Sequence, residues 1–498
     1  MATIKLIDVS MRDGNQSLWG ATGMTTQQIE QIAPILDRAG LYAIDFTSST
    51  HMGIAVRTHK QCPWERIRRA HAAMPNTPLQ FIGTGLRFIS WESSHPDFMQ
   101  LAYNKLVENG LHRYALLEPN HDMDNLLTNA AMVRKAGAHE IVGALTFTIS
   151  EIHSDDYFAD IAAQMAASPN IDRVYIKDPS GLMSPERART LIPAVIKRLN
   201  GKPLELHSHT TIAYSPLSYM EAAALGVEVL HTACGPLANG SSLPNAERIA
   251  ANLREFGHTV DVDDRLLAQA ADYFLRIAEV ENRPIGRPQE FDAAFLRHQI
   301  AGGVMTTTRR QLSELKLEHR FDEVVQEVGR VRAELGYPIM VTPFAQMVCT
   351  QALYNVISTE RYSNVSDQVI RYVLGKFGRP AAPVDGNVKD RILALRRAKE
   401  LNVETPALSP TELRKRFKPG ISDEELILRA TMPAEEVDAM LAAGPAPKHY
   451  NPDAQPLLTL LKELSQRPSN QEIRIEKPGF KLRVGKQNTE VLHDKQVV

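Results

Sequence analysis

The chain has 498 residues, of which 43% are hydrophobic and 23% are charged. Its formal net charge of -2 disfavours a general nucleic-acid binder and electrostatic attachment to anionic lipid. No apolar run approaches the roughly 20 residues of a membrane-spanning helix, and the first residues lack a signal-peptide core. The three cysteines form neither a disulfide framework nor a metal-binding spacing. We therefore expect a soluble, cytoplasmic protein of two or more domains.

Eight short and nearly continuous apolar runs occupy the first half of the chain. They cover residues 4–10, 41–48, 79–85, 113–119, 140–150, 173–180, 204–210 and 227–235. Such runs are typical of parallel strands that are buried on both faces. Amphipathic helical patterns separate them. In residues 25–40, for example, we expect Thr26 to cap a helix and Gly40 to end it.

Eight strand–helix pairs within about 260 residues predict a (β/α)8 TIM barrel. A doubly wound open sheet is the alternative, but no Gly-rich dinucleotide turn follows the first strand. Beyond residue 260 the strand runs disappear and helix-period segments follow. We expect the barrel over residues 1–285, a mostly helical domain over 286–445, and a small helix-hairpin tail over 455–487.

Polar residues at the carboxyl ends of the strands are the candidate active-site residues, because these ends form the active face of a TIM barrel. These ends carry Arg12, Asp13, Gln16, Asp45, Lys177, Asp178, His207, His209 and His231. His207 and His209 are two positions apart on one strand and point to the same face. Two neighbouring imidazoles suit a divalent metal, and Asp13 could add an oxygen ligand. The alternatives are a hydrogen-bonded histidine pair or one inward histidine and one loop histidine, and for Asp13 a turn-capping or helix-capping carboxylate.

Lys177 ends an apolar strand, where an unpaired ammonium costs several kcal/mol. Beside a metal, a cationic lysine would repel the ion, so the lysine would have to be neutral or modified. Addition of CO2 to its amine would give a carbamate, an anion that can bind the metal. The alternative is that Lys177 pairs with Asp178 or Asp13 without a metal, and residue chemistry leaves both readings open.

Five segments carry a family resemblance through their order and spacing. They are IDVSMRDGNQSLWGATGMTTQQI, PWERIRRAHAAMPNTPLQF, YIKDPSGLMSP, LELHSHTT and GPLANGSSLPN. Together they resemble the carboxyltransferase domain of pyruvate carboxylase and its relatives, which include the oxaloacetate decarboxylase α subunit. The resemblance extends from about residue 3 to about residue 440.

The resemblance implies a metal-binding barrel with a helical domain that closes over its mouth. The implied ligands of the zinc or manganese ion are Asp13, Lys177 as its carbamate, His207 and His209. The family's P-G-G-Q-Y-T segment reads AGGVMTTT here, which places Thr306 at the threonine that shuttles a proton between biotin and substrate. Gln16 falls on a glutamine that contacts the substrate.

The substrate-binding segments depart from the family pattern. Thr84 stands where the family carries an arginine that grips the pyruvate carboxylate, and Arg87 follows three residues later. Thr210 replaces the aspartate that usually follows the histidine motif. A guanidinium is the natural clamp for a carboxylate, so an acceptor that is larger than pyruvate or uncharged is expected. The candidate substrate-binding residues are Arg12, Gln16, Thr84 and Arg87.

The implied function is the carboxyltransferase component of a multi-subunit biotin-dependent carboxylase, which moves CO2 between carboxybiotin and a small carbonyl-type acceptor through an enolate. No A-M-K-M biotin-carrier motif occurs, so we expect biotin to arrive on a separate carrier protein. The tail over 455–487 resembles the segment of a biotin carrier protein that docks on biotin carboxylase, although packing on its own barrel is equally open. A homo-oligomer is also expected.

Two other functions are open. Lyases and condensing enzymes related to 3-hydroxy-3-methylglutaryl-CoA lyase and isopropylmalate synthase share RDG-x-Q and H-x-H, and RDGNQ is closer to that branch. They lack the K-D-x-x-G lysine and the helical funnel, which favours the carboxyltransferase. A non-catalytic scaffold protein is the third possibility, and the retained metal-site and threonine positions count against it.

Overall fold

The computed structural model describes residues 3–90, 93–300, 302–403, 406–417, 419–452, 457, 460, 461, 463, 464, 472–477 and 480–485. Eight parallel strands close into a barrel in chain order, with the first strand paired to the eighth. The strands are β1 (Lys5–Asp8), β2 (Ala43–Ser48), β3 (Leu79–Thr84), β4 (Arg113–Leu117), β5 (Glu140–Thr146), β6 (Arg173–Asp178), β7 (Leu204–Ser208) and β8 (Val229–Thr232). Each lies within one of the predicted apolar runs, so the predicted TIM barrel is confirmed.

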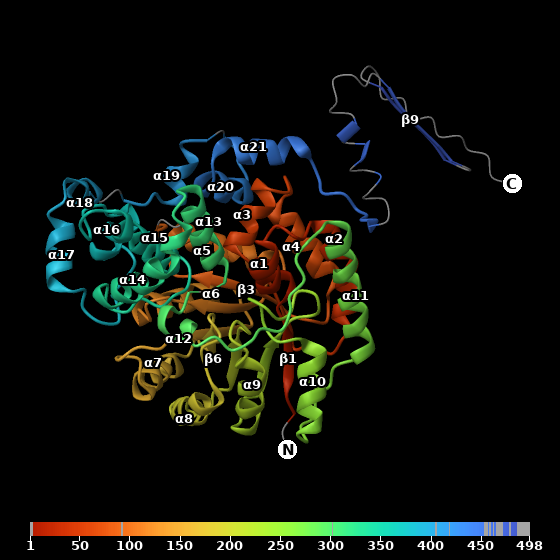
Figure 1. Ribbon diagram of the computed structural model, residues 1–498. Coiled ribbons are helices and arrows are strands. Elements are labelled where there is room, and N and C mark those ends of the chain that lie inside the picture. Colours follow the sequence, from red (N-terminus) through yellow and green to blue (C-terminus); the bar gives the residue numbers. More distant parts are fainter. Residues whose placement is uncertain are drawn as a thin grey trace.

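Helices surround the barrel and bury their apolar faces against it (Figure 1). They are α2 (Thr26–Asp37), α3 (Ser49–Arg57), α4 (Pro63–Ala73), α5 (Pro96–Glu108), α6 (Met123–Lys135), α7 (Asp155–Ala167), α8 (Pro185–Ile196), α9 (Ser215–Ala224), α10 (Ala246–Glu255) and α11 (Asp264–Val280). The cap of α2 differs from the prediction, because Thr25 occupies it and forms a capping box with Gln28. Thr26 is instead the first helical residue, and the helix ends before Gly40.

A short helical segment fills the gap between β1 and α2. It consists of a π-helical turn, η1 (Ser10–Gly14), followed by α1 (Asn15–Trp19). π-helical turns are rare and are frequently found at functional sites. All five residues of η1 are buried, so its polar side chains face the interior at the barrel mouth.

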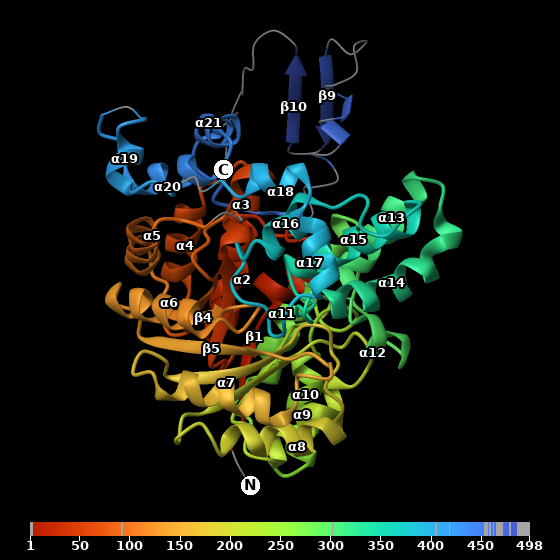
Figure 2. The same ribbon diagram turned by 90° about the vertical axis from the view of Figure 1, so that its left-hand side faces the viewer.

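The second half of the described chain is helical (Figure 2). Its helices are α12 (Ala294–His298), α13 (Gly302–Glu314), η2 (Glu318–Arg320), α14 (Phe321–Glu334), α15 (Phe344–Ile357), α16 (Asp367–Val373), α17 (Gly386–Leu393), α18 (Arg396–Leu401), α19 (Pro410–Arg414), α20 (Asp423–Thr431) and α21 (Ala434–Ala443). A second hydrophobic core, built from residues between 300 and 398, joins α13 to α18. In contrast, α20 and α21 pack on α5 and α3 and add to the barrel core.

The two last strands form an antiparallel pair, β9 (Glu472–Lys477) and β10 (Phe480–Gly485), at the predicted EIRIE and FKLRV runs. Both views show this pair standing away from the barrel (Figures 1 and 2). Among the described helices, none combines the length and the apolar character that a membrane crossing requires.

Candidate metal centre and active site

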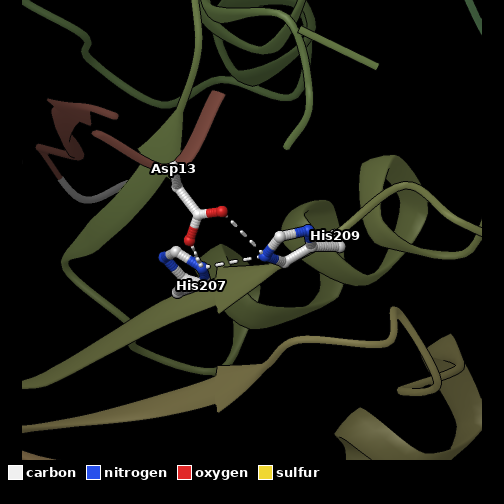
Figure 3. Close-up of side chains that lie close together, drawn as sticks. All are labelled: Asp13, His207 and His209. Carbon is white, nitrogen blue, oxygen red and sulfur yellow. Dashed lines mark hydrogen bonds and ion pairs between the residues drawn. The ribbon is translucent and has the colours of Figure 1, made fainter. Parts of the chain in front are cut away.

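Three buried side chains converge at the mouth of the barrel (Figure 3). Asp13 comes from η1, His207 from β7, and His209 directly follows β7. Asp13 Oδ2 lies 3.2 Å from His207 Nε2, and Asp13 Oδ1 lies 3.5 Å from His209 Nε2. The two Nε2 atoms are 3.3 Å apart. The structure thus brings together three of the candidate residues at the carboxyl ends of the strands.

The spacing of these atoms fits a shared divalent metal. Ligand atoms at about 2.0–2.1 Å from a tetrahedral metal are separated from one another by about 3.4 Å. The observed separations run from 3.2 to 3.5 Å. A carboxylate and two imidazoles are ligand types that suit both zinc and manganese.

The hydrogen bond of His209 orients it toward this cluster. Its Nδ1 lies 2.6 Å from the carbonyl oxygen of Ser241, which can only accept, so Nδ1 carries the proton. For a neutral ring, Nε2 then presents a lone pair toward the Asp13 carboxylate. Two acceptors facing each other in this way are stabilised by a cation between them. The donor set therefore fits a metal ion.

Arg12 and Ser17 hold the Asp13 carboxylate in place. Arg12 Nη1 lies 2.9 Å from Asp13 Oδ2, and the Ser17 hydroxyl donates to Oδ1 at 3.0 Å. Arg12 Nε in turn donates to Asp45 Oδ2 at 2.8 Å. Burial alone would raise the pKa of Asp13, but Arg12, His209 and Lys177 outweigh it and hold that pKa well below its usual range. Asp13 is thus anionic, as a metal ligand must be.

Lys177 completes the cluster. β6 and β7 pair with Lys177 opposite His207, which places Lys177 Nζ 3.1 Å from His207 Nε2 and 3.5 Å from Asp13 Oδ2. Burial lowers the pKa of Lys177 to about 8, although Asp13 opposes the shift. A pKa this close to neutrality makes the free amine accessible, and the free amine is the form that reacts with CO2.

Asp178 does not pair with Lys177. Its two oxygens accept the backbone N–H groups of Leu182 and Met183 at 2.9 Å each, and Oδ2 also accepts the Ser208 hydroxyl at 2.8 Å. The carboxylate therefore fixes the turn that follows β6. Of the two acidic partners considered for Lys177, the structure places only Asp13 beside it.

We expect Gly181→Ala to be destabilising, because Gly181 allows this turn to approach His209 closely. Gly181 has φ +68°, and a Cβ atom there would lie 2.3 Å from the carbonyl oxygen of His209. The left-handed conformation alone costs an alanine about 1–2 kcal/mol, and the clash adds to it. Urea unfolding should show a loss of more than about 2 kcal/mol.

Gly201→Ala is the matched control. Gly201 has φ +81°, and its surroundings hold nothing within 4 Å of the added Cβ atom. It should cost only the conformational term of about 1–2 kcal/mol. Equal losses in the two variants would show that the close approach to His209 contributes nothing to stability.

A cavity of about 240 Å³ opens above the cluster. Its floor is formed by Asp13, Lys177 and His209, and Gln16, Thr84 and Arg87 line its walls. Residues from the helical region complete the wall, namely Val304, Met340, Val341, Thr342, Ala345 and Gln346. The helical region therefore contributes part of the wall of the candidate site.

Arg87 reaches this cavity although it lies three residues beyond the end of β3. A bridge between Thr84 and Arg87 turns the chain back, with Gly85 between them at φ +51°. Arg87 Nη2 donates to the carbonyl oxygen of Lys376 at 3.1 Å, and its guanidinium lies 5.2 Å from the centre of the Phe377 ring. These contacts attach the loop after β3 to the helical region.

Thr306 lies in α13, which contacts α1, the helix that carries Gln16. The side chain of Thr306 is outside the described residues. Its neighbour Val304 lines the cavity, so the backbone of α13 runs along the wall of the site.

Several residues of the site were not among the predicted ones. Ser17 and the Ser241 carbonyl group contact the cluster, and Glu205 lies below it. Glu205 precedes His207 by two positions, so strand periodicity could have placed it on the same inner face.

Thr210, which stands in the place of an aspartate, donates its hydroxyl to the carbonyl oxygens of Gly240 and Ser242 at 2.9 and 3.1 Å.

Comparisons with known proteins find relatives along most of the chain. A family model described as a conserved carboxylase domain matches residues 295–472. A pyruvate carboxylase subunit of Methanocaldococcus jannaschii is 30% identical, over 99% of this chain and 87% of the relative. The methylmalonyl-CoA carboxyltransferase 5S subunit of Propionibacterium freudenreichii subsp. shermanii is 29% identical, over 86% of each chain.

The fold resembles that of a solved pyruvate carboxylase domain. The carboxyl transferase domain of Rhizobium etli pyruvate carboxylase superposes with a TM-score of 0.83 at 19% identity, over 98% of this chain and 84% of that domain. The chain is a carboxyltransferase component, because it matches carboxylase and carboxyltransferase subunits along most of its length. It belongs to the family of biotin-dependent carboxylase subunits that includes the pyruvate carboxylase subunit of Methanocaldococcus jannaschii.

Proposed function

We propose that this carboxyltransferase holds a zinc or manganese ion through Asp13, His207, His209 and the carbamate of Lys177. The observation that carries the proposal is the convergence of the first three ligand atoms within 4.8 Å of one another, with Lys177 Nζ beside them. Asp13, His209 and Lys177 line a cavity to which the helical region also contributes residues. A recessed site of this kind suits chemistry that must limit the access of water.

The metal site and the residues around the cavity would have different roles in the reaction. A divalent metal at this position would supply Lewis-acid stabilisation of the charge that develops on the acceptor as its enolate forms. Gln16 and Arg12, both in the cavity lining, would orient the acceptor. We assign the proton transfer to Thr306, whose hydroxyl proton passes to biotin while its oxygen receives a proton from the acceptor carbon. The threonine is then unchanged after each turnover.

We propose further that Arg87 binds the carboxylate of the acceptor, in place of the arginine that the family carries at the position of Thr84. Both residues line the cavity, and Arg87 approaches it from the loop after β3. A guanidinium set back from the end of the strand would accommodate an acid longer than pyruvate. The acceptor class supported by this arrangement is a 2-oxo acid with an extended side chain.

Replacing Arg87 with methionine should weaken acceptor binding. A hydrogen bond to a charged group contributes about 1.5–3 kcal/mol, so the Kd for 2-oxo acids of increasing length should rise about 10- to 100-fold. Calorimetric titration of the metal-loaded protein measures this. Arg379→Met is the control, because Arg379 is exposed and pairs with Asp124 at 3.0 Å outside the cavity lining. Unchanged affinity in the Arg87 variant would remove Arg87 from the acceptor site.

We propose that biotin arrives on a separate carrier protein and that a biotin carboxylase partner carboxylates it. The name of the Methanocaldococcus relative, which is one subunit of its enzyme, supports a multi-subunit assembly.

We divide the chain into a barrel over 1–285, a helical domain over 286–445 and a tail over 455–487 that docks a partner. The separate core between residues 300 and 398 and the outlying β9–β10 pair support this division, whereas α20 and α21 pack on the barrel. We also propose a homo-oligomer and a cytoplasmic location.

A pull-down from the native host tests the function directly. The tagged chain should recover a biotinylated protein, and the recovered complex should exchange labelled CO2 between carboxybiotin and a 2-oxo acid. Recovery of no biotinylated partner, together with cleavage of an acyl-CoA or a keto acid by the chain alone, would contradict it.

A further inference from the structure

A line of buried side chains runs from the barrel interior up to His207. Glu205 lies on β7, two residues before His207, and His231 lies on the neighbouring strand β8. Glu205 Oε2 is 3.1 Å from His231 Nε2, and His231 Nδ1 is 3.1 Å from His207 Nδ1. None of the three is more than 1% exposed. Each contact is therefore a hydrogen bond in a dry environment, where its direction matters.

Glu205 determines which groups donate and which accept in this row of hydrogen bonds. Arg113 Nη2 donates to its two oxygens at 2.7 and 2.8 Å, and Arg173 Nε donates at 2.6 Å. Two guanidinium groups, of Arg113 and Arg173, thus pair with this one carboxylate, which keeps Glu205 ionised. An ionised carboxylate only accepts hydrogen bonds. Nε2 of His231 must therefore be the donor.

The donor and acceptor roles of the His231 nitrogens determine which nitrogen of His207 carries the proton. A neutral His231 that donates through Nε2 to Glu205 presents a lone pair at Nδ1. Two ring nitrogens 3.1 Å apart share one proton, which must then reside on Nδ1 of His207. This leaves Nε2 of His207 unprotonated. The neighbour Lys177 agrees, because an ammonium group 3.1 Å away can only donate to that nitrogen.

We propose that Glu205 and His231 are positioning residues that fix the tautomer of His207, so that Nε2 offers its lone pair to the metal site. The inference rests on the metal centre proposed above and adds two residues that contact neither the metal ligand atoms nor the acceptor. His209 obtains the same orientation from the carbonyl oxygen of Ser241. Glu205 and His231 therefore set the tautomer of His207 only, and a substitution of His231 can remove this effect.

The test compares three variants of the full chain. His231→Phe removes the acceptor for His207 Nδ1 and keeps a planar ring. His231→Gln restores the line, because its amide can donate to Glu205 and accept from His207. Tyr175→Phe is the control, since Tyr175 stacks on His231 with ring centres 5.5 Å apart and its buried hydroxyl has no hydrogen-bond partner among the described residues. Circular dichroism and thermal melting confirm that each variant folds.

Two readouts decide the outcome. With Zn²⁺ alone as the probe, chelator competition should show a Kd raised about 10- to 100-fold in His231→Phe. The Kd should stay within about threefold of the parent in His231→Gln and Tyr175→Phe. In the metal-free parent labelled with ¹⁵N-histidine, NMR should show His207 protonated at Nδ1, and this state should be lost in His231→Phe.

The proposal fails if His207 of the metal-free parent carries its proton on Nε2. It also fails if His231→Phe binds Zn²⁺ as tightly as the parent. A parent that binds no Zn²⁺ contradicts the proposed metal centre instead, while the NMR result still decides whether Glu205 and His231 set the tautomer.

Discussion

Replacing Thr306 with alanine should lower the rate of carboxyl transfer by about 10²- to 10⁴-fold, the usual contribution of a positioned proton-transfer group. Metal content should not change, because Asp13 comes from η1 and the two histidines come from β7 and the residue after it, not from α13. The measurement is single-turnover transfer of labelled CO2 from carboxybiotin to the acceptor, together with metal analysis of the purified variant.

Thr308→Ala is the matched control on the same helix. Its hydroxyl donates to the carbonyl oxygen of Val304 at 3.0 Å, so its loss should affect local stability and leave the transfer rate nearly unchanged. If the Thr306 and Thr308 variants lose activity equally, the effect comes from the helix and not from a proton carried by Thr306.

Replacing Lys177 should have the other large effect. In Lys177→Met no carbamate can form, so the site loses one ligand and retains only Asp13, His207 and His209. Metal affinity should fall by at least about 100-fold, the upper end of the loss caused by an outer-shell partner, and carboxyl transfer should fall below detection. Elemental analysis after dialysis and the transfer assay measure both quantities.

Lys177→Arg separates the two roles that the sequence left open for this lysine. An arginine keeps a positive charge beside Asp13 but cannot form the carbamate, so it should be as inactive and as metal-poor as the methionine variant. If Lys177 served only as a counter-ion to Asp13, the arginine variant would remain active while the methionine variant would not. Full activity in Lys177→Arg would therefore contradict the carbamate.

The barrel could be predicted from the sequence because its strands are buried on both faces. Each of the eight strands falls in an apolar run that β-branched and other apolar residues make nearly continuous, and such runs admit few other structures. Helix boundaries were harder to predict. The cap of α2 is Thr25 and not the neighbouring Thr26, because Gln28 contacts Thr25 whereas the Thr26 hydroxyl accepts a hydrogen bond from Arg66 Nε at 3.1 Å.

The candidate metal ligands could also be predicted, since strand periodicity and the carboxyl-end rule place them on one face. The surroundings of His207 could not. The partners of Glu205 come from β4, β6 and β8, through Arg113, Arg173 and His231, and no local pattern links these positions. The contribution of residues 340–346 to the cavity wall could not be predicted either, because a helical pattern in the sequence does not show which part of the protein the helix contacts.

The position of Arg87 at the proposed acceptor site could not be predicted from the sequence either. Thr84 marks the missing arginine in the sequence, but the position of Arg87 depends on how the loop after β3 folds. The turn at Gly85 and the contacts with Lys376 and Phe377 bring Arg87 to the cavity. These contacts join segments almost 300 residues apart in the chain, between the barrel and the helical region.

Electron density at the barrel mouth, from crystals grown with bicarbonate and a divalent metal, tests the central claim most directly. We predict continuous density beyond Lys177 Nζ for a carbamate. We also predict one metal, identified by its anomalous signal, bound to that carbamate, Asp13, His207 and His209. An unmodified Lys177 with no metal between the histidines would contradict the proposed carboxyltransferase centre.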